Sequence, residues 1–391
     1  MEAVTDVVFR HVVKKAGAPD VFFTEFANAT GWVHAGDKAI AGRLIKTNDE
    51  HPLVAQIWGG EPGDMEQFAA HCAQLGFDGI DINMGCPAKS AIKSGGAALI
   101  RRPDVAIASI AAAKTAGLPV SVKTRLGYTY IDEWHEWLSA LLAQNLANLT
   151  IHLRTKKEMS KVPAHYELID DIIKLRDEIA PQTLLTINGD IRNRAHGEEL
   201  ARQHPGINGI MIGRGVFSDP FCFRASRAVS QKKSGLALAG PGLFYDDTRE
   251  MGNKYAKLET VEHSRGADVS AERSRSISSG DLSEKSTPAK ERGAGDADFA
   301  DDVREASEAI RKEYSEGAEL SITTRKTELI ALLHYHLDLF DYYQPTLGRP
   351  YETLKRFFKI YIRDFDGAKE LRDQLMHTKN TSEVRQILEE I

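Results

Sequence analysis

The sequence predicts an α/β fold of the TIM-type (β/α)8 barrel class, followed by a small all-α helical bundle. Short apolar runs alternate with longer segments of helical periodicity from residue 21 to residue 212, and such repeated βα units build a parallel sheet. Polar residues follow many of the apolar runs, as in a barrel, where the site is built from the ends of several strands. In an open doubly wound sheet the functional residues lie at one switch point instead. This spread favours the barrel, and the residues at the strand ends are Glu25, Gln56, Asn83, Lys123, His152, Asn188 and Gly213.

The first element is a helix that Thr5 or Asp6 can cap and that ends near Ala16, with Gly17 as its stop. Strands are expected at residues 21–25, 53–58, 79–83, 120–123, 149–152, 184–188 and 207–212. Helices are expected between them at residues 62–75, 104–116, 132–144, 166–179 and 194–204. The pattern therefore gives seven strands, where a complete barrel of this type has eight.

Composition divides the chain into a barrel at 1–230, an insertion at 231–301 and a helical region at 302–391. From about residue 246 the insertion is rich in Ser, Gly and charged residues, so it is expected to be mobile, with an RNA-contacting arm as the alternative. Three helical stripes follow, formed by Ile330, Leu333, Leu337 and Phe340, by Leu354, Phe357, Phe358 and Tyr361, and by Leu371 and Leu375. Basic residues interleave with the second stripe at Arg349, Lys355, Arg356, Lys359 and Arg363. They form either a solvated helix face or a surface for RNA.

The composition of the whole chain restricts the cellular compartment and the binding partners that we expect. The net charge of −6 and the pI near 6.1 mean that any RNA contact must come from local basic patches. The cysteines, Cys72, Cys86 and Cys222, include no close pair, which fits neither a disulfide framework nor a metal site. No apolar run approaches the roughly 20 residues of a membrane span, and residues 1–10 lack the basic-then-apolar pattern of a signal peptide. We therefore expect a cytoplasmic protein, a monomer, with no metal and no membrane contact.

Cys86 lies in the stretch around which these observations gather. The apolar run at 79–83 ends in Asn83-Met84-Gly85-Cys86-Pro87, a turn sequence that places the cysteine at the mouth of the barrel. Cys72 and Cys222 are expected to be core residues. Cys86 can serve as a general acid, because a thiol of pKa near 8.5 is protonated at neutral pH. A thiolate nucleophile activated by Lys89 or Lys93 is the alternative.

Two glycine-containing segments at later strand ends indicate a phosphate site. They are Asn188-Gly189-Asp190 and Gly213-Arg214-Gly215, each expected to open a helix. Loops after the last two strands of such barrels commonly hold a phosphate, because glycine lets backbone N–H groups approach it. No GxGxxG follows a first strand, so a Rossmann dinucleotide site is not indicated.

The Asn-Met-Gly-Cys-Pro segment, with Lys93 and Gly95-Gly96-Ala97-Ala98-Leu99, resembles the active-site segment of the tRNA-dihydrouridine synthases. The resemblance implies an FMN barrel with a helical tRNA-binding domain, in which NADPH (or NADH) reduces the flavin and a hydride passes to C6 of a uridine swung out of tRNA. Cys86 would then protonate C5. Family members begin their barrel with a strand just ahead of the Val-Thr-Asp found here at Val4-Thr5-Asp6, so the first strand is expected to be missing from this chain.

The resemblance also assigns residues. Gln56, Lys123 and His152 match positions that contact the flavin ring or phosphate, and the phosphate loops add Asn188, Gly189, Asp190, Gly213 and Arg214. Asn83, Arg125 and Arg154 would contact the uridine or its phosphate, and Lys355, Arg356 and Lys359 the tRNA. Lys123 is also expected near an anion on physical grounds, since a lysine in a barrel mouth is costly without one. The family usually has His-Gly-Arg where this chain has His152-Leu153-Arg154, so a leucine stands here at the position where glycine lets the backbone approach a ligand closely.

Two other functions are compatible with parts of the sequence. A flavin barrel that acts on a free pyrimidine, as dihydroorotate dehydrogenases do, would not need the basic C-terminal helix. A tRNA-binding protein without flavin would need none of the barrel-mouth residues. Bound flavin, visible by its absorbance, separates the last function from the other two.

Overall fold

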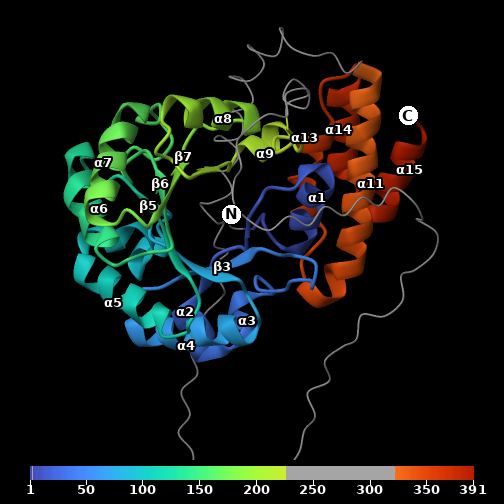
Figure 1. Ribbon diagram of the computed structural model, residues 1–391. Helices are drawn as coiled ribbons and strands as arrows, with labels where there is room; N and C mark the ends of the chain where they lie inside the picture. Colours follow the sequence, from blue (N-terminus) through green and yellow to red (C-terminus); the bar gives the residue numbers. More distant parts are fainter. Residues whose placement is uncertain (2, 226–321) are drawn as a thin grey trace, which may run out of the picture. The chain divides into compact units, whose positions relative to one another are not determined.

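The computed structural model describes residues 1, 3–225 and 322–391; the expected insertion at 231–301 and the residues before 322 in the expected helical region lie outside the described residues. In the described part, parallel strands curl around a central axis and helices cover the outer side of the sheet (Figure 1). The strands are β1 (Phe22–Phe23), β2 (Ala27–Asn28), β3 (Leu53–Trp58), β4 (Gly79–Asn83), β5 (Val120–Arg125), β6 (Asn148–His152), β7 (Leu184–Asn188) and β8 (Gly209–Met211). The expected TIM-type barrel architecture is confirmed.

The order of pairing explains the count of seven strands. Strands β1 and β2 both pair with β3, one at its start and one at its end, so together they occupy the place of the single strand expected at 21–25. From β3 the path runs through β4, β5, β6 and β7 to β8. Among the described residues no ladder joins β8 to β1, and the half-buried residues of β8 lie at that open edge.

The helices follow the strands as the sequence predicts. Asp6 caps α1 by accepting a hydrogen bond from the Phe9 N–H at 2.9 Å, and Pro62 and Pro103 stand in the first turns of α4 and α5. Two short helices between β2 and β3 were not expected. The helices of this part are α1 (Val7–Gly17), α2 (Ala29–Ala35), α3 (Asp37–Ile40), α4 (Pro62–Gln74), α5 (Pro103–Lys114), α6 (Trp134–Leu142), α7 (Ile169–Ile179), α8 (Arg194–Gln203) and α9 (Gly215–Ser218).

The two faces of the curled sheet differ in chemistry. Alternate residues such as Ile80, Val122 and Ile151 pack with the covering helices in the main apolar core. The residues between them face the barrel interior and are mostly polar. Strand register brings Gln56, Asp81, Ser121 and Asn148 to one level, and Asn83, Lys123, Thr150 and Thr186 to the next. Barrel interiors are usually filled by branched apolar residues, so this polar filling indicates a binding site rather than a packed core.

The C-terminal helices confirm the three expected apolar stripes. Leu333, Leu337, Tyr361 and Leu375 are fully buried in one core. The stretch that was expected to be one basic helix is instead two short ones, α12 and α13, with a turn between them. The helices here are α11 (Ile322–Leu347), α12 (Glu352–Lys355), α13 (Phe358–Tyr361), α14 (Ala368–His377) and α15 (Thr381–Glu389).

These helices share their core with α1, which lies beside α11 in Figure 1. The Phe9 and Phe357 ring centroids are 4.9 Å apart. Arg349, which follows α11, is largely buried, with 16% of its side chain exposed, and forms ion pairs with Asp6, at 2.8 Å, and with the completely buried Glu25. The C-terminal region is therefore fixed to the barrel both by apolar packing and by a buried charge.

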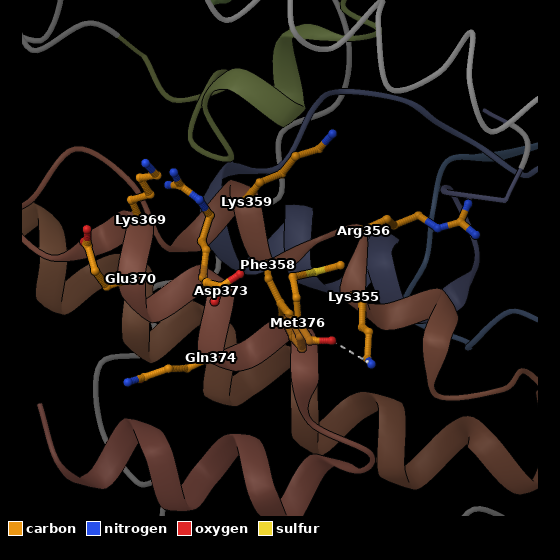
Figure 2. A pocket seen from close by; sticks show the side chains of 10 residues that line it. Lys355, Arg356, Phe358, Lys359, Lys369, Glu370, Asp373, Gln374 and Met376 are labelled. Atoms are coloured by element: carbon orange, nitrogen blue, oxygen red, sulfur yellow. Dashed lines mark hydrogen bonds between the residues drawn. The ribbon is translucent and has the colours of Figure 1, made fainter.

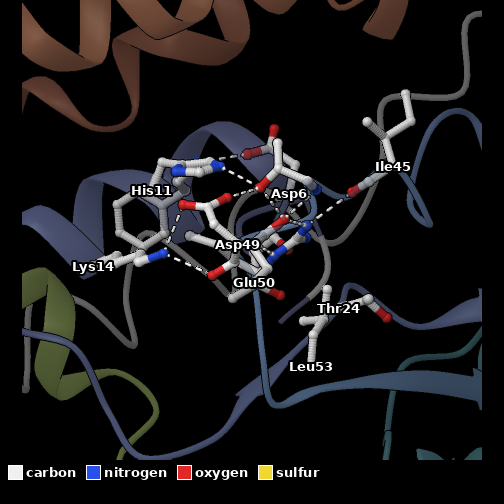
Figure 3. Close-up of polar contacts among 12 residues, drawn as sticks. Asp6, His11, Lys14, Thr24, Ile45, Asp49, Glu50 and Leu53 are labelled. Atoms are coloured by element: carbon white, nitrogen blue, oxygen red, sulfur yellow. Dashed lines mark hydrogen bonds and ion pairs between the residues drawn. The ribbon is translucent and has the colours of Figure 1, made fainter. Parts of the chain in front are cut away.

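A second buried ion pair fixes the segment that leads into β3. The Arg10 guanidinium donates to both carboxylate oxygens of Glu50, at 2.6 and 3.0 Å, and to the carbonyl of Ile45 at 2.8 Å. Figure 3 shows this network, in which Lys14 also pairs with Asp49 at 2.8 Å. Bidentate pairing satisfies a guanidinium that is almost completely buried. Helix α1 thus holds the barrel on one side and the C-terminal helices on the other.

Within the described residues, no helix has the length and apolar character needed to cross a membrane.

Candidate active site

The Cys86 loop leaves the carboxyl end of β4 and is fixed by Asn83. The Asn83 side-chain oxygen accepts hydrogen bonds from the N–H groups of Gly85, at 3.1 Å, and Cys86, at 3.0 Å, which closes a local turn. The Cys86 carbonyl accepts from Ala97 N–H at 3.0 Å. Gly96 has φ of +56°, and a Cβ there would stand 2.9 Å from that carbonyl oxygen, so only glycine fits.

The three cysteines are placed as the sequence predicts. Cys72 and Cys222 are buried in the apolar cores, while Cys86 is only half-buried. Burial raises the pKa of the Cys72 thiol to about 12 and that of Cys222 also far above its usual range. Both are therefore inert packing residues, and Cys86 is the thiol that lies at the mouth of the barrel.

A buried carboxyl group beneath this loop was missed by the sequence analysis. Asp81 is completely buried and accepts hydrogen bonds from the Gln56 amide and the Ser121 hydroxyl, each at 2.7 Å. Gln56 in turn accepts from the Asn83 amide at 3.4 Å. Because the Gln56 amide nitrogen donates to Asp81, its oxygen turns to the Asn83 amide, and Asn83 in turn presents its own oxygen to the Cys86 loop. Burial raises the pKa of Asp81, against the lowering effect of Ser121, Gln56 and Lys123.

Lys123, on β5, lies close enough to Asp81 and Cys86 for their charges to act on it. Burial and the neighbouring Arg125 lower its pKa to about 8, and Asp81 and Cys86 oppose that shift. A lysine with this pKa is mostly protonated at neutral pH and is poorly solvated. It is therefore suited to meet an anion inside the barrel, as the sequence analysis expects.

The two arginines expected to contact substrate lie in the wall of the site. Arg125 is buried and donates to the carbonyls of Gly85, at 2.8 Å, and of Thr155 and Met159, at 3.1 and 3.0 Å. Arg154 is 2% exposed and donates to Val162 and to Asp190. Arg125 thus joins the Cys86 loop to the loop after β6.

The glycine-containing segments after β7 and β8 lie next to each other. The Asn188 amide donates to the Met211 carbonyl at 2.8 Å, and Arg214 stands 3.7 Å from the Asp190 carboxylate. Gly189 has φ of +124°, and a Cβ there would meet Ala164 at 3.0 Å. A Cβ on Gly213 would find only the Asn188 amide, at 3.9 Å, so this backbone faces open space where a phosphate could approach.

These segments open helices less directly than the sequence predicts. Helix α8 begins at Arg194 and is capped by Asn193, so residues 191–193 separate it from Asp190. Helix α9 does follow Arg214 but is only four residues long. Attraction for a phosphate must therefore come from side-chain cations and backbone N–H groups rather than from a helix dipole.

His152 shows how positive this part of the mouth is. Its pKa is lowered well below the usual value by burial and then by the nearby charges of Arg125, Lys123, Arg154 and Arg214. The imidazole is therefore neutral at physiological pH and can donate one hydrogen bond. Four cations face one ion-paired carboxylate, Asp190, and the buried Asp81, so the arrangement favours a bound anion.

The basic residues expected to bind tRNA gather in a groove between α13 and α14. Figure 2 shows this groove, which has a volume of about 690 Å³ and is lined by Lys355, Arg356, Phe358, Lys359, Lys369, Glu370, Arg372, Asp373, Gln374 and Met376. Lys355 donates to the Met376 carbonyl at 2.9 Å, and burial lowers the pKa of Lys359. Lys369 and Arg372 were not among the expected tRNA-binding residues, because the sequence of α14 shows no basic run.

Two of the interleaved basic residues do not belong to that surface. Arg349 is committed to the buried ion pairs with Asp6 and Glu25. Arg363 pairs with Asp364 at 2.7 Å and donates to the carbonyl of Ser218 in the barrel. The expectation that all five basic residues share one face is wrong for these two, because contacts with the barrel hold their guanidinium groups. Arg356 does line the groove, although its guanidinium also donates to the Ala3 carbonyl at 3.3 Å.

Comparison with known proteins gives a consistent result. The family description "Dihydrouridine synthase (Dus)" matches residues 1–262. "Probable tRNA-dihydrouridine synthase 2" of Bacillus subtilis (strain 168) is 45% identical over 392 residues, covering 100% of this chain and 91% of that protein. "Probable tRNA-dihydrouridine synthase" of Staphylococcus aureus (strain Mu50) is 42% identical, with 100% and 90% covered. The protein of the same name from Staphylococcus epidermidis (strain ATCC 35984) is 42% identical, with 100% and 91% covered.

Proposed function

The chain belongs to the dihydrouridine synthase family, and from this premise we propose that it reduces the 5,6-double bond of specific uridines in tRNA, with FMN as cofactor and NADPH or NADH as reductant. Hydride addition at C6 and protonation at C5 give dihydrouridine, while NADPH becomes NADP⁺. We further propose that residues 1–230 form the catalytic domain and 302–391 the tRNA-binding domain, and that the enzyme is a cytoplasmic monomer.

The donor set in the barrel mouth fits FMN. Lys123 supplies a cation inside the barrel, as a reduced flavin ring requires, and His152 supplies a neutral donor. Arg214 and the open backbone at Gly213 suit a phosphate, and Gln56 is fixed by Asp81. When bound there, FMN supplies the hydride that reduces the uracil ring.

Cys86 completes the chemistry as the general acid. Its backbone is held by Asn83 and by Ala97, and its half-buried side chain lies at the carboxyl end of β4. The developing charge at C5 takes the thiol proton. Lys123, on which the charge of Cys86 acts, stabilises the thiolate that this transfer leaves behind.

The observation that carries this proposal is the fixed Cys86 loop beside a buried cation cluster, in a chain that matches the family from residue 1. The test is to incubate the purified protein with FMN, NADPH and unmodified tRNA transcripts and to measure dihydrouridine by mass spectrometry. The choice of substrate would be contradicted if the protein contains flavin and reduces a free pyrimidine but leaves the tRNA transcripts unreduced. A protein that binds tRNA but no FMN would contradict the chemistry.

If Lys123 meets the flavin, Lys123→Ala should retain markedly less FMN after gel filtration, because the site loses its innermost cation. The loss of affinity should amount to about 1 to 3 kcal/mol, the range for a charged hydrogen bond. The Lys123 pKa is about 8, so the parent should lose FMN affinity as pH rises through 8. Above that pH the FMN affinities of the parent and of Lys123→Ala should become more similar. Fluorescence titration with FMN measures both effects.

Lys174→Ala is the matched control, because this exposed lysine lies on α7 and pairs with Asp171 at 2.9 Å. Equal FMN affinity in Lys123→Ala and Lys174→Ala would remove Lys123 from the cofactor site.

If the groove between α13 and α14 binds tRNA, replacing Lys355, Arg356 and Lys359 together by alanine should weaken binding. The plot of log K for tRNA binding against log salt concentration should also become less steep. Its slope should lose about 2 to 3 units in magnitude, close to one unit for each phosphate that is no longer neutralised. A control with the same change of charge replaces Lys174, Arg194 and Arg202 on α7 and α8. Salt slopes that agree between the two triple variants would make the groove an ordinary solvated surface. Melting temperatures check that both variants are folded.

A further inference from the structure

We propose that a patch on the rim of the barrel binds the unpaired nucleotides next to the target uridine, an inference that rests on the tRNA-modifying function proposed above. The patch, called the rim patch below, consists of Arg101, Tyr128, Tyr130, Lys156 and Lys157. None of these residues was singled out by the sequence analysis, because they come from three separate loops.

The three loops lie on the same side of the barrel as Cys86. Arg101 ends the 3-10 helix η2 (Gly96–Arg101), in the segment that follows β4 and the Cys86 loop. Tyr128 and Tyr130 follow β5, and Lys156 and Lys157 follow β6. Because all these strands are parallel neighbours, their carboxyl ends, and the loops that follow, share one rim.

Cations and aromatic rings are interleaved in the rim patch. The Arg101 guanidinium carbon lies 3.8 Å from the centroid of the Tyr128 ring, and the Lys156 Nζ lies 5.0 Å from it. The Lys157 Nζ lies 5.7 Å from the centroid of the Tyr130 ring, which is 65% exposed. An exposed ring beside cations provides both a stacking surface for a base and partners for its phosphates.

The rim patch is held in place by backbone contacts. The Glu133 carboxylate accepts hydrogen bonds from the N–H groups of Tyr128, at 2.6 Å, and Tyr130, at 3.0 Å. The N–H groups of Lys156 and Lys157 donate to the carbonyls of Gly127 and Tyr128, at 2.8 and 2.9 Å. The Tyr130 loop and the lysine loop are therefore joined, so little ordering is needed when a ligand binds.

Arg125 connects the rim patch to the active site. It donates on one side to Gly85, the neighbour of Cys86, and on the other to Thr155 and Met159, which flank the two lysines. A nucleotide on the rim patch and a uracil at Cys86 would thus lie on loops joined by one buried guanidinium. Single-stranded RNA fits best, because an exposed ring can stack only on a base that is not already paired. Stacking there would also offset the cost of swinging the uridine out.

The test compares Tyr130→Ala with Tyr130→Phe, using a pool of unmodified tRNA transcripts as the probe. Loss of the ring should weaken binding by roughly 5- to 150-fold, the range for one base stacked on an aromatic side chain. Tyr130→Phe keeps the stacking surface and should bind within about twofold of the parent. KM for tRNA should rise in Tyr130→Ala. Lys157→Ala should reduce the magnitude of the slope of log K for tRNA binding against log salt concentration by about 0.7, the value for one phosphate of a single strand, whereas the control Lys174→Ala should leave it unchanged.

Parent-like binding by Tyr130→Ala would overturn the proposal, as would an equal loss for Tyr130→Phe. An equal loss of affinity for a fully paired RNA duplex would also overturn it, since stacking would then play no part. The proposed function is judged separately by whether the parent forms dihydrouridine. A parent that binds the transcripts through Tyr130 without reducing them would contradict the function and still support the rim patch as an RNA-binding surface.

Discussion

Replacing Cys86 by alanine is expected to slow the reoxidation of reduced flavin by tRNA by roughly 10²- to 10⁴-fold, the usual effect of losing a general acid. Reduction of the flavin by NADPH involves no uracil, so that half-reaction should continue at close to the parent rate. Stopped-flow absorbance of the flavin measures the two half-reactions separately. The expected asymmetry follows from the position of Cys86, whose loop is held by Asn83 at the carboxyl end of β4.

Cys86→Ser is the sharper variant, because a hydroxyl is a much weaker acid than a thiol of similar size and should restore little activity. Cys72→Ala is the control, since that thiol is buried against the core and has its pKa raised to about 12. Reoxidation of Cys86→Ala by tRNA at the parent rate would make the Cys86 loop purely structural. A slowed reduction by NADPH would instead indicate that Cys86 supports the cofactor.

Replacing Arg349 by methionine is expected to lower the free energy of unfolding by about 3 to 5 kcal/mol, the cost of leaving one member of a buried ion pair uncompensated. Arg349 pairs with Asp6 and with the completely buried Glu25. Chemical denaturation followed by circular dichroism measures the change. The exposed pair of Arg194 and Glu198 on α8 provides the control, and Arg194→Met should cost less than about 1 kcal/mol.

The loss in Arg349→Met should depend on pH with a definite sign. Burial already raises the pKa of Asp6, and Arg349 opposes that rise. Without Arg349 the folded-state pKa lies higher still, so stability is lost as pH rises from the unfolded value near 4 through the folded value. The variant should therefore recover stability as pH falls. Adding Glu25→Gln should restore part of the loss at neutral pH, because it removes a buried charge; no recovery in the double variant would contradict this account.

Much of the barrel could be predicted from the sequence because its signals are local. The strands β3, β4 and β7 have the predicted bounds, since apolar runs flanked by turn residues leave little choice of register. The position of Cys86 followed from the same logic, because a Gly-Cys-Pro turn after a buried strand must lie at the strand's exit. The three C-terminal stripes were equally local, and their residues are buried as expected except Ile330, which is partly buried.

The partners of polar side chains could not be predicted in this way. Asp81 looks like any alternating polar residue until strand register sets Gln56 and Ser121 beside it. Arg125 and Arg349 were grouped with the RNA-facing or substrate-facing cations because sequence gives their charge and not their contacts. The rim patch was not detected, since its members are separated by up to 56 positions in the chain, from 101 to 157.

The sequence by itself determined the order of the βα units, the cysteine at the mouth of the barrel and the apolar faces of the C-terminal helices, because each depends on periodicity within one element. Only the tertiary structure decided which charges are buried in ion pairs and which line a surface. Arg349 and Lys355 lie six residues apart, yet Asp6 and Glu25 bind the first while the second lines an open groove. The physical reason is that the energy of a charge depends on neighbours brought from distant parts of the chain, and these neighbours are set by packing rather than by local pattern.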